Sequence, residues 1–334
     1  MSDNSSGQLM AKRETGWFRG IAVVMIVLSH YAEWWSWFVP TEGNAELFRF
    51  ALSKLGVYGV DIFFLFSGYA LVKSLGQECM HPDFVWKRIR NVYIPYLIVI
   101  GIIEILSGGF TSMHDFWNYI SGYDYWYMAV LFIFYIGFIA VYTIMGGKGP
   151  RAVTFCIFTY IFTSVLYNKG MHDFWYVSNI AFAMGVVAGE YEEPIGKVVK
   201  KAGIPMVLVL TVGMGFVIWS GLDEGMIVGN IPDEQHLWME ISASVVWTLL
   251  ILVLAAQLRI KDKVFTFLGN QSLYVYLIHT YVFMRCVNNF KLDYIWIFVI
   301  SAVLTVAVSY LLHYVIDAMG RRISHGKSEN SRKI

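Results

Sequence analysis

The sequence is poor in charge. Only 15% of its 334 residues are Asp, Glu, Lys or Arg, and the 25 basic and 24 acidic residues leave a formal net charge of +1. About a quarter of an ordinary soluble domain is charged, so this chain cannot cover a globule of its size with polar surface. A basic domain or stripe, which a nucleic-acid partner would need, is also lacking. The composition therefore argues against both a soluble protein and a nucleic-acid binder.

Cysteine is scarce as well. The three cysteines, Cys79, Cys156 and Cys286, lie far apart and form no CxxC pair. This spacing argues against a disulfide framework and against a zinc site. No bound metal is expected.

What the sequence has instead is apolar residues, which make up 57% of the chain. A bilayer core is crossed by about 20 apolar residues in a helix. Apolar stretches near this length predict an all-α integral membrane protein with about ten transmembrane helices. They cover 17–39, 54–73, 92–107, 126–145, 152–167, 174–190, 202–222, 238–258, 265–288 and 294–316. For one of the three short stretches (92–107, 152–167 and 174–190), a re-entrant segment is the alternative.

The distribution of Lys and Arg sets the expected orientation. Nineteen of these residues lie in the set of connections that includes both termini, and four lie in the other set. The positive-inside rule then places both termini in the cytoplasm and requires an even number of spans. The first span is too long for a signal peptide and no small-residue cleavage site follows it. The expected organisation is a disordered tail at 1–15, a single membrane domain at 16–317 and a basic cytoplasmic tail at 318–334.

Ionisable groups inside the spans are candidates for function, because a charge in the bilayer costs at least a few kcal/mol. Arg19 and His30 are eleven residues apart, so they share one helix face at a separation of roughly 16 Å. Glu33 lies one turn beyond His30. The alternatives are an Arg19 that extends to the inner headgroups and a His30 that is a hydrogen-bonded core residue.

Other spans place ionisable groups at a similar depth in the outer half of the membrane. They are Asp61, Glu104 and His279. One polar cavity shared with His30 and Glu33 is the economical explanation, and several unrelated local pairs are the alternative. On the cytoplasmic side, the cluster of Lys87, Arg88 and Arg90 either serves orientation alone or binds the phosphates of a nucleotide-like molecule.

Several motifs then coincide, in order, with those of a known family. They are Arg19-Gly-Ile-Ala…His30, Gly59-Val-Asp61-Ile-Phe-Phe-Leu-Phe-Ser67-Gly-Tyr69, Lys87-Arg88…Pro95-Tyr96, Trp126-Tyr127-Met-Ala-Val-Leu-Phe, Leu268-Gly269-Asn-Gln-Ser272-Leu-Tyr274-Val-Tyr276-Leu277-Ile-His279, and Ser309-Tyr310…Asp317. Together they cover about residues 16–317 and resemble the membrane acyltransferase 3 family. The chain departs from the family pattern at Asn91, where a further Arg is frequent, and at Asp317, where Glu is more frequent.

The resemblance implies a stand-alone O-acyltransferase of the bacterial inner membrane. It would move an acyl group, usually acetyl, from cytoplasmic acetyl-CoA or another acyl-CoA to a hydroxyl of a cell-surface glycan or glycolipid. His30, with an unperturbed pKa near 6.5, is suited to be the general base. Glu33 or Asp61 would fix its tautomer, and Arg19, Lys87, Arg88 and Arg90 would hold the donor's phosphates or polarise its carbonyl.

The expected substrate contacts come from hydroxyl-bearing, aromatic and imidazole side chains, namely Ser67, Trp126, Tyr127, Ser272, Tyr276 and His279. Because no cysteine lies near these motifs, direct transfer is expected. A proton-coupled transporter of small solutes is the alternative, since intramembrane His and carboxylates also relay protons. The second half of the chain has no counterpart of the Arg19…His30 pattern, although internal repeats are common in transporters. A non-catalytic membrane partner in glycan assembly is a third reading, but it leaves the buried charges unexplained.

Overall fold

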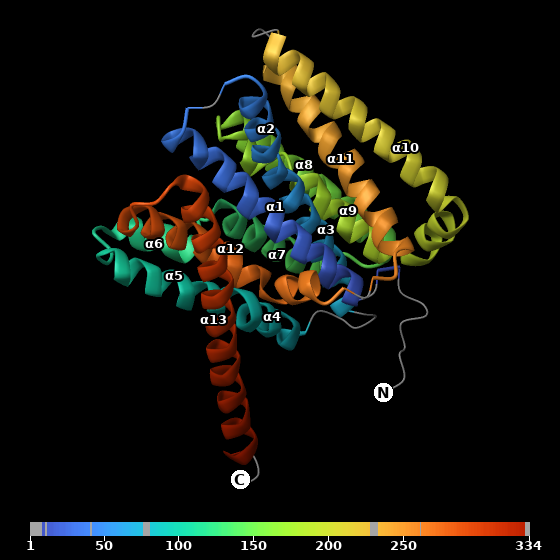
Figure 1. The fold of residues 1–334 in the computed structure, drawn as a ribbon. Helices are drawn as coiled ribbons and strands as arrows, with labels where there is room; N and C mark the ends of the chain where they lie inside the picture. The colour runs from blue at the N-terminus through green and yellow to red at the C-terminus, as the bar shows by residue number, and fades with distance from the viewer. Residues whose placement is uncertain are drawn as a thin grey trace.

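The computed structural model describes residues 9–10, 12–40, 42–75, 81–227, 233–260 and 262–330, and these residues form helices and no strand. Figure 1 shows the bundle. The elements are α1 (Lys12–Phe38), α2 (Asn44–Ser53), α3 (Leu55–Leu75), α4 (Pro82–Arg88), the π-helix η1 (Ile89–Tyr93), α5 (Ile94–Ser107), α6 (Met113–Ser121), α7 (Trp126–Ile144), α8 (Lys148–Asn168), the 3₁₀ turn η2 (Asp173–Trp175), α9 (Asn179–Glu190), α10 (Glu192–Ile227), α11 (Asp233–Gln257), α12 (Val264–Asn289) and α13 (Tyr294–Asn330).

Within these described ranges, seven helical segments are long and apolar enough to cross a membrane. They are Asn44–Leu75, Pro82–Ser107, Trp126–Ile144, Lys148–Asn168, Glu192–Val217, Leu237–Gln257 and Tyr294–Gly320. Each corresponds to one of the ten spans expected from the sequence. The chain is therefore a multi-pass helical membrane protein.

The other three expected spans, 17–39, 174–190 and 265–288, fall in α1, α9 and α12 and do not reach that threshold. α9 has only 12 residues, or about 18 Å of helix, whereas the hydrocarbon core is about 30 Å thick. α1 and α12 are long, but they carry polar and ionisable groups such as Arg19, His30 and His279. That these three segments cross the bilayer remains a prediction.

Glycines bring the central helices into close contact. A Cβ on Gly20 of α1 would lie 1.9 Å from the carbonyl oxygen of Phe265, and one on Gly269 of α12 would lie 1.8 Å from that of Gly16. α3 and α9 meet in the same way, because a Cβ on Gly185 would lie 2.1 Å from the Leu65 carbonyl oxygen. Backbone contact of this kind is typical of helix packing in membranes.

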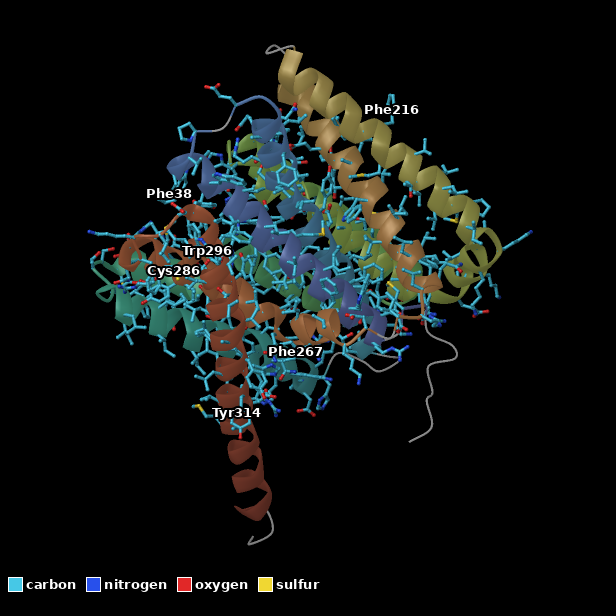
Figure 2. All side chains as sticks on the ribbon, viewed as in Figure 1. Phe38, Phe216, Phe267, Cys286, Trp296 and Tyr314 are labelled. Carbon is cyan, nitrogen blue, oxygen red and sulfur yellow. The ribbon has the colours of Figure 1, made fainter. Side chains whose placement is uncertain are left out.

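The peripheral helices present apolar side chains to the outside. Only 17% of the apolar window of α8, and the same share of that of α10, is buried, against 67% for the segment that contains α3. Figure 2 shows Phe216 on α10 and Trp296 and Tyr314 on α13 among the side chains of this periphery. An exposed apolar belt is what lipid contact requires.

Helix extends into both segments that the sequence predicts as tails, because α1 begins at Lys12 and α13 continues to Asn330. In Figure 1, α1 begins and α13 ends on the same, lower side of the bundle, and α13 extends beyond the other helices there. A cytoplasmic location of that side stays a prediction.

Candidate active site

The two intramembrane histidines singled out from the sequence face each other. Nδ1 of His30 lies 2.7 Å from Nε2 of His279, and the rings are nearly parallel, with their centroids 4.9 Å apart. A close contact between Gly20 and Gly269, where a Cβ on Gly269 would lie 3.0 Å from the Gly20 nitrogen, explains this meeting, because α1 and α12 run side by side in the same direction from it. Each histidine follows its glycine by ten residues, or about 15 Å of helix.

Aromatic rings enclose this pair. The Trp34 ring stacks on His30 at 5.6 Å and also lies 6.4 Å from the His279 ring. The Tyr276 ring is 6.0 Å from that of His279. His279 is buried, whereas the His30 side chain stays partly accessible.

Asp61 lies away from the histidine pair. Its carboxylate accepts a hydrogen bond of 2.8 Å from Ser244 of α11 and is fully buried. Glycines of α3 make its contact with α1, since a Cβ on Gly59 would lie 2.7 Å from the Ala22 carbonyl oxygen. Asp61 follows Gly59 by two residues, or about 200° around the helix. It therefore faces α11 and not His30.

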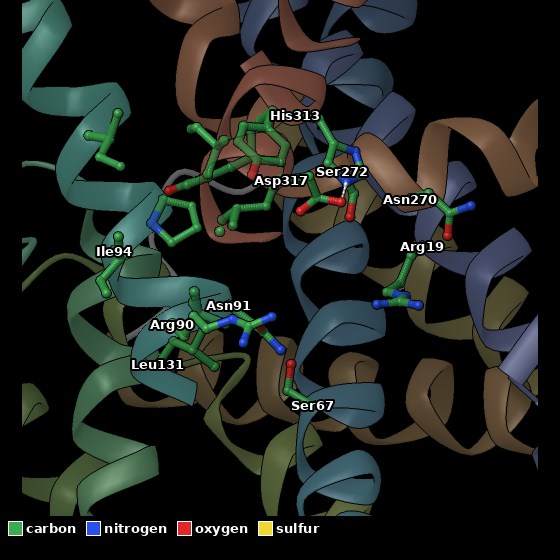
Figure 3. A pocket seen from close by; sticks show the side chains of 18 of the residues that line it. Arg19, Ser67, Arg90, Asn91, Ile94, Leu131, Asn270, Ser272, His313 and Asp317 are labelled. Atoms are coloured by element: carbon green, nitrogen blue, oxygen red, sulfur yellow. Dashed lines mark ion pairs between the residues drawn. The ribbon is translucent and has the colours of Figure 1, made fainter. Parts of the chain in front are cut away.

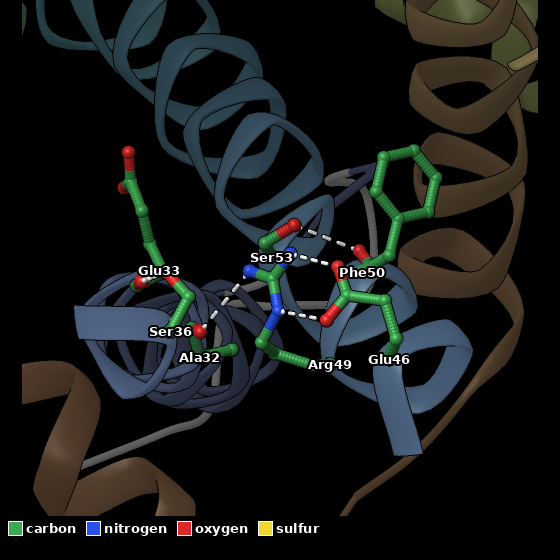
Figure 4. A network of polar contacts seen from close by, with 7 residues as sticks. All are labelled: Ala32, Glu33, Ser36, Glu46, Arg49, Phe50 and Ser53. Carbon is green, nitrogen blue, oxygen red and sulfur yellow. Dashed lines mark hydrogen bonds and ion pairs between the residues drawn. The ribbon is translucent and has the colours of Figure 1, made fainter. Parts of the chain in front are cut away.

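Glu33 is also not in hydrogen-bond contact with His30. It is exposed, and in Figure 4 it lies beside a network at the end of α1 that links α1 to α2. There Arg49 forms an ion pair with Glu46, and its Nη1 donates to the Ala32 carbonyl at 3.4 Å. Neither expected carboxylate occupies the position next to the imidazole of His30, where His279 lies.

A cavity of about 730 Å³ opens between α1, α3, α4, η1, α5, α7, α12 and α13. Six of the side chains expected to bind or react line it, namely Arg19, Ser67, Arg90, Tyr127, Ser272 and Tyr276. Figure 3 shows Arg19, Ser67 and Arg90 around the same space, with His313 and Asp317 on another side of it. Tyr276 lines the cavity and also neighbours His279, so this tyrosine joins the cavity to the histidine pair.

The cavity region is rich in cationic groups without acidic partners. Among the residues that the structure describes, no carboxylate lies within 4.0 Å of the guanidinium groups of Arg19, Arg88 or Arg90. Arg88 lies behind the lining, where it stacks on Phe84 at 4.8 Å and donates to Ser74, and its Nε is buried without a partner. Unpaired guanidinium groups beside a cavity favour an anionic ligand.

The π-helix η1 shapes the cationic end. Pro95 has no backbone N–H, and its ring would clash with the carbonyl four residues earlier, that of Asn91, in a regular α-helix. The chain widens into a π-turn over Ile89–Tyr93, just before this proline. Arg90 and Asn91 line the cavity from this turn. Single π-turns of this kind are frequent at functional sites.

The structure adds lining residues that sequence reasoning missed. His313 donates from Nδ1 to the amide oxygen of Gln271 over 2.6 Å, and its Nε2 lies 3.4 Å from Asp317. The spacing of four residues between His313 and Asp317 could have suggested this pair. Tyr135 lines the cavity together with Ser67 and Tyr127. Nothing in the sequence distinguishes Tyr135 from the other aromatic residues of α7.

The remaining residues expected at the site lie outside the cavity or form hydrogen bonds within their own helix. Lys87 is exposed on α4 and does not line the cavity. Trp126 belongs to an aromatic cluster with Phe174 and Trp175. Ser272 lines the cavity, but its hydroxyl donates to the Gly269 carbonyl at 2.9 Å. The described residues contain no group of three His, Cys, Asp or Glu side chains suited to a metal ion.

A family model described as an acyltransferase domain, that of acyltransferase 3, matches residues 15–314. The chain belongs to the acyltransferase 3 family. This confirms the resemblance seen in the motifs and identifies the protein as a membrane acyltransferase. No curated protein and no solved structure matches the chain.

Proposed function

We propose that this acyltransferase moves an acyl group, acetyl in the simplest case, from acyl-CoA to a hydroxyl of a cell-surface glycan or glycolipid. The donor enters from the cytoplasmic side of a bacterial inner membrane, and His30 is the general base. The observation that carries the proposal is the continuity of the site. A cavity flanked by unpaired guanidinium groups ends at Tyr276, which neighbours the histidine pair.

The side chains around the cavity suit a coenzyme A thioester. Arg19 and Arg90 reach it from two sides, and Arg88 keeps a buried Nε without a partner behind it. Guanidinium forks match phosphate geometry. Asn91 and Asn270 add amide groups for hydrogen bonds along the lining. A volume of about 730 Å³ is within the range of cofactor sites.

His30 would act in a single displacement. As the acceptor oxygen bonds to the thioester carbonyl carbon, the imidazole takes the hydroxyl proton. The carbon–sulfur bond then breaks, and the imidazole returns the proton to the leaving sulfur. Every bond and proton is accounted for, and no oxidant or reductant is needed. The rings of Tyr127 and Tyr276, which line the cavity, offer apolar faces to the acceptor.

Two experiments test this function. Acetyl-CoA should raise the thermal stability of the detergent-solubilised protein, and the Arg19→Ala variant should lose this effect. Mass spectrometry of surface glycans should show an acetyl increment in the wild-type strain that is missing in a deletion strain. A protein that acetyl-CoA does not stabilise, together with unchanged glycans, would contradict the proposal.

The transporter alternative predicts a different readout. Proton-driven uptake of a solute into vesicles without any CoA compound would support a carrier. Membership of the acyltransferase 3 family does not favour that outcome.

A further inference from the structure

His279 makes a hydrogen bond that fixes its own tautomer. Its Nδ1 lies 2.7 Å from the Tyr276 carbonyl oxygen and 3.2 Å from that of Val275, both in the preceding turn of α12. Because a carbonyl oxygen only accepts, Nδ1 of His279 must carry a hydrogen and donate it. In a neutral ring, Nε2 of His279 then holds a lone pair.

The charge state of the pair follows from its surroundings. Among the described residues, no carboxylate lies within 4.0 Å of either imidazole ring. An imidazolium without a counter-ion at this depth would be costly, so both rings are neutral at rest. One hydrogen must lie between the two nitrogens that are 2.7 Å apart. Since Nε2 of His279 holds the lone pair, that hydrogen belongs to Nδ1 of His30.

We propose that His279 is a positioning residue, which holds His30 in the tautomer whose free lone pair is on Nε2. This inference rests on the proposed role of His30 as the base. His30 Nδ1 donates to His279 Nε2, and His279 Nδ1 donates to the helix backbone. The Tyr276 carbonyl, His279 and His30 form a chain of hydrogen bonds. In this chain His279 has the position beside the base that a carboxylate has in a hydrolase triad.

The assigned tautomer leaves a reactive atom available. Nε2 of His30 has no hydrogen-bond partner among the described residues, and the side chain is partly accessible. A base needs such a nitrogen within hydrogen-bond distance of the acceptor hydroxyl. This chain of hydrogen bonds also provides a neutral acceptor for the Nδ1 hydrogen when His30 becomes an imidazolium during the reaction. His279 thus orients His30 without contact with either substrate.

Two variants of His279 test the positioning role. His279→Leu removes the acceptor and should lower kcat roughly 100-fold or more, because loss of tautomer control removes much of the contribution of a general base. The KM for acetyl-CoA should stay within about 3-fold, since the donor phosphates bind at the other end of the cavity. His279→Gln keeps an acceptor oxygen near the position of Nε2 and should recover at least about 10-fold of the loss.

The outcomes separate positioning from a structural role. Both variants must elute as the wild type does in size exclusion and retain the acetyl-CoA thermal shift. Under those conditions, an equal loss of kcat in the His279→Leu and His279→Gln variants would overturn the proposal. A wild-type kcat in the His279→Leu variant would overturn it as well. If the Leu variant does not fold, the wild-type protein still provides the decisive measurement.

That measurement is the ¹⁵N NMR spectrum of wild-type protein labelled at histidine, with His30→Gln and His279→Gln spectra used for assignment. We expect a protonated Nδ1 and an unprotonated Nε2 on both rings. A protonated Nε2 on His30 would overturn the inference. This spectrum needs no turnover, so it judges the tautomer even if the chain transfers no acyl group. In that case the proposed function fails separately.

Discussion

The cavity and the histidine pair lie next to each other but differ in kind. The cavity is open, has a volume of about 730 Å³ and is flanked by guanidinium groups without carboxylate partners in the described residues. The histidine pair is packed against Trp34 and Tyr276, and it bonds to the backbone. One region suits the capture of a large anion, and the other suits a neutral base.

This difference shows how one bundle can separate binding from chemistry. Cationic groups must lie where the donor's phosphates can reach them, whereas a buried imidazole without a carboxylate beside it stays unprotonated, as a base must be before it takes a proton. Tyr276 contributes to both regions because it lines the cavity and neighbours His279. Variants of each region should therefore have separable effects on kcat and KM.

The largest effect is expected from His30→Ala. Loss of a general base should lower kcat for acyl transfer by about 10²–10⁴, while the stabilisation by acetyl-CoA persists. The exposed His114 provides the matched control, since His114→Ala should leave both properties unchanged. Near-normal acyl transfer by the His30→Ala variant would show that His30 is not the general base.

The next effect concerns the cationic side of the comparison. Arg90→Ala, which removes a guanidinium group from the cavity lining, should raise the KM for acetyl-CoA roughly 10- to 100-fold, the value of one or two charge-assisted hydrogen bonds, with kcat changed less. Arg151, which donates to the Met145 carbonyl outside the cavity, is the control residue. A fall in kcat at unchanged KM would show that the two regions are not separate.

A smaller effect is expected where the two regions meet. Tyr276→Leu opens the contact between the cavity and the histidine pair, so water should reach the donor and release CoA without an acceptor a few-fold faster. Tyr276→Phe keeps the ring and should retain the low background rate. Thiol release from acetyl-CoA in the absence of acceptor measures both rates, and identical values for Leu and Phe would contradict a barrier at Tyr276.

The smallest effect is expected from Arg49→Ala, in the network that links α2 to the end of α1 in Figure 4. Its ion pair with Glu46 is partly exposed, so its loss should cost about 1 kcal/mol or less in stability. Thermal unfolding of Arg49→Ala and Arg49→Lys measures this cost. A large loss of acyl transfer would instead show that the end of α1 controls the histidine pair.

Much of the fold could be predicted because the bilayer imposes its own pattern. The seven apolar helices that the structure confirms are those whose lipid-facing side chains must be apolar over the membrane thickness. That α1, α9 and α12 also cross the membrane stays a prediction, because a helix surrounded by protein can be short or polar. Their interior position is visible only when their neighbours are placed.

The candidate site was predictable in composition but not in its contacts. Arg19, His30 and His279 stood out because ionisable residues are rare in spans. Depth alone also suggested Asp61 and Glu33 as partners of His30. The direction that each side chain takes around its helix decided otherwise, since Asp61 lies opposite the face of α3 that meets α1.

The sequence by itself determined that this chain is a helical membrane protein with motifs of the acyltransferase 3 family, because apolar length and motif order are local properties. Only the tertiary structure decided that His30 meets His279 and that Asp61 bonds to Ser244. Those pairings depend on the register of backbone contacts such as Gly20 with Phe265. A close approach of two helices is a property of both surfaces together, and no single segment encodes it.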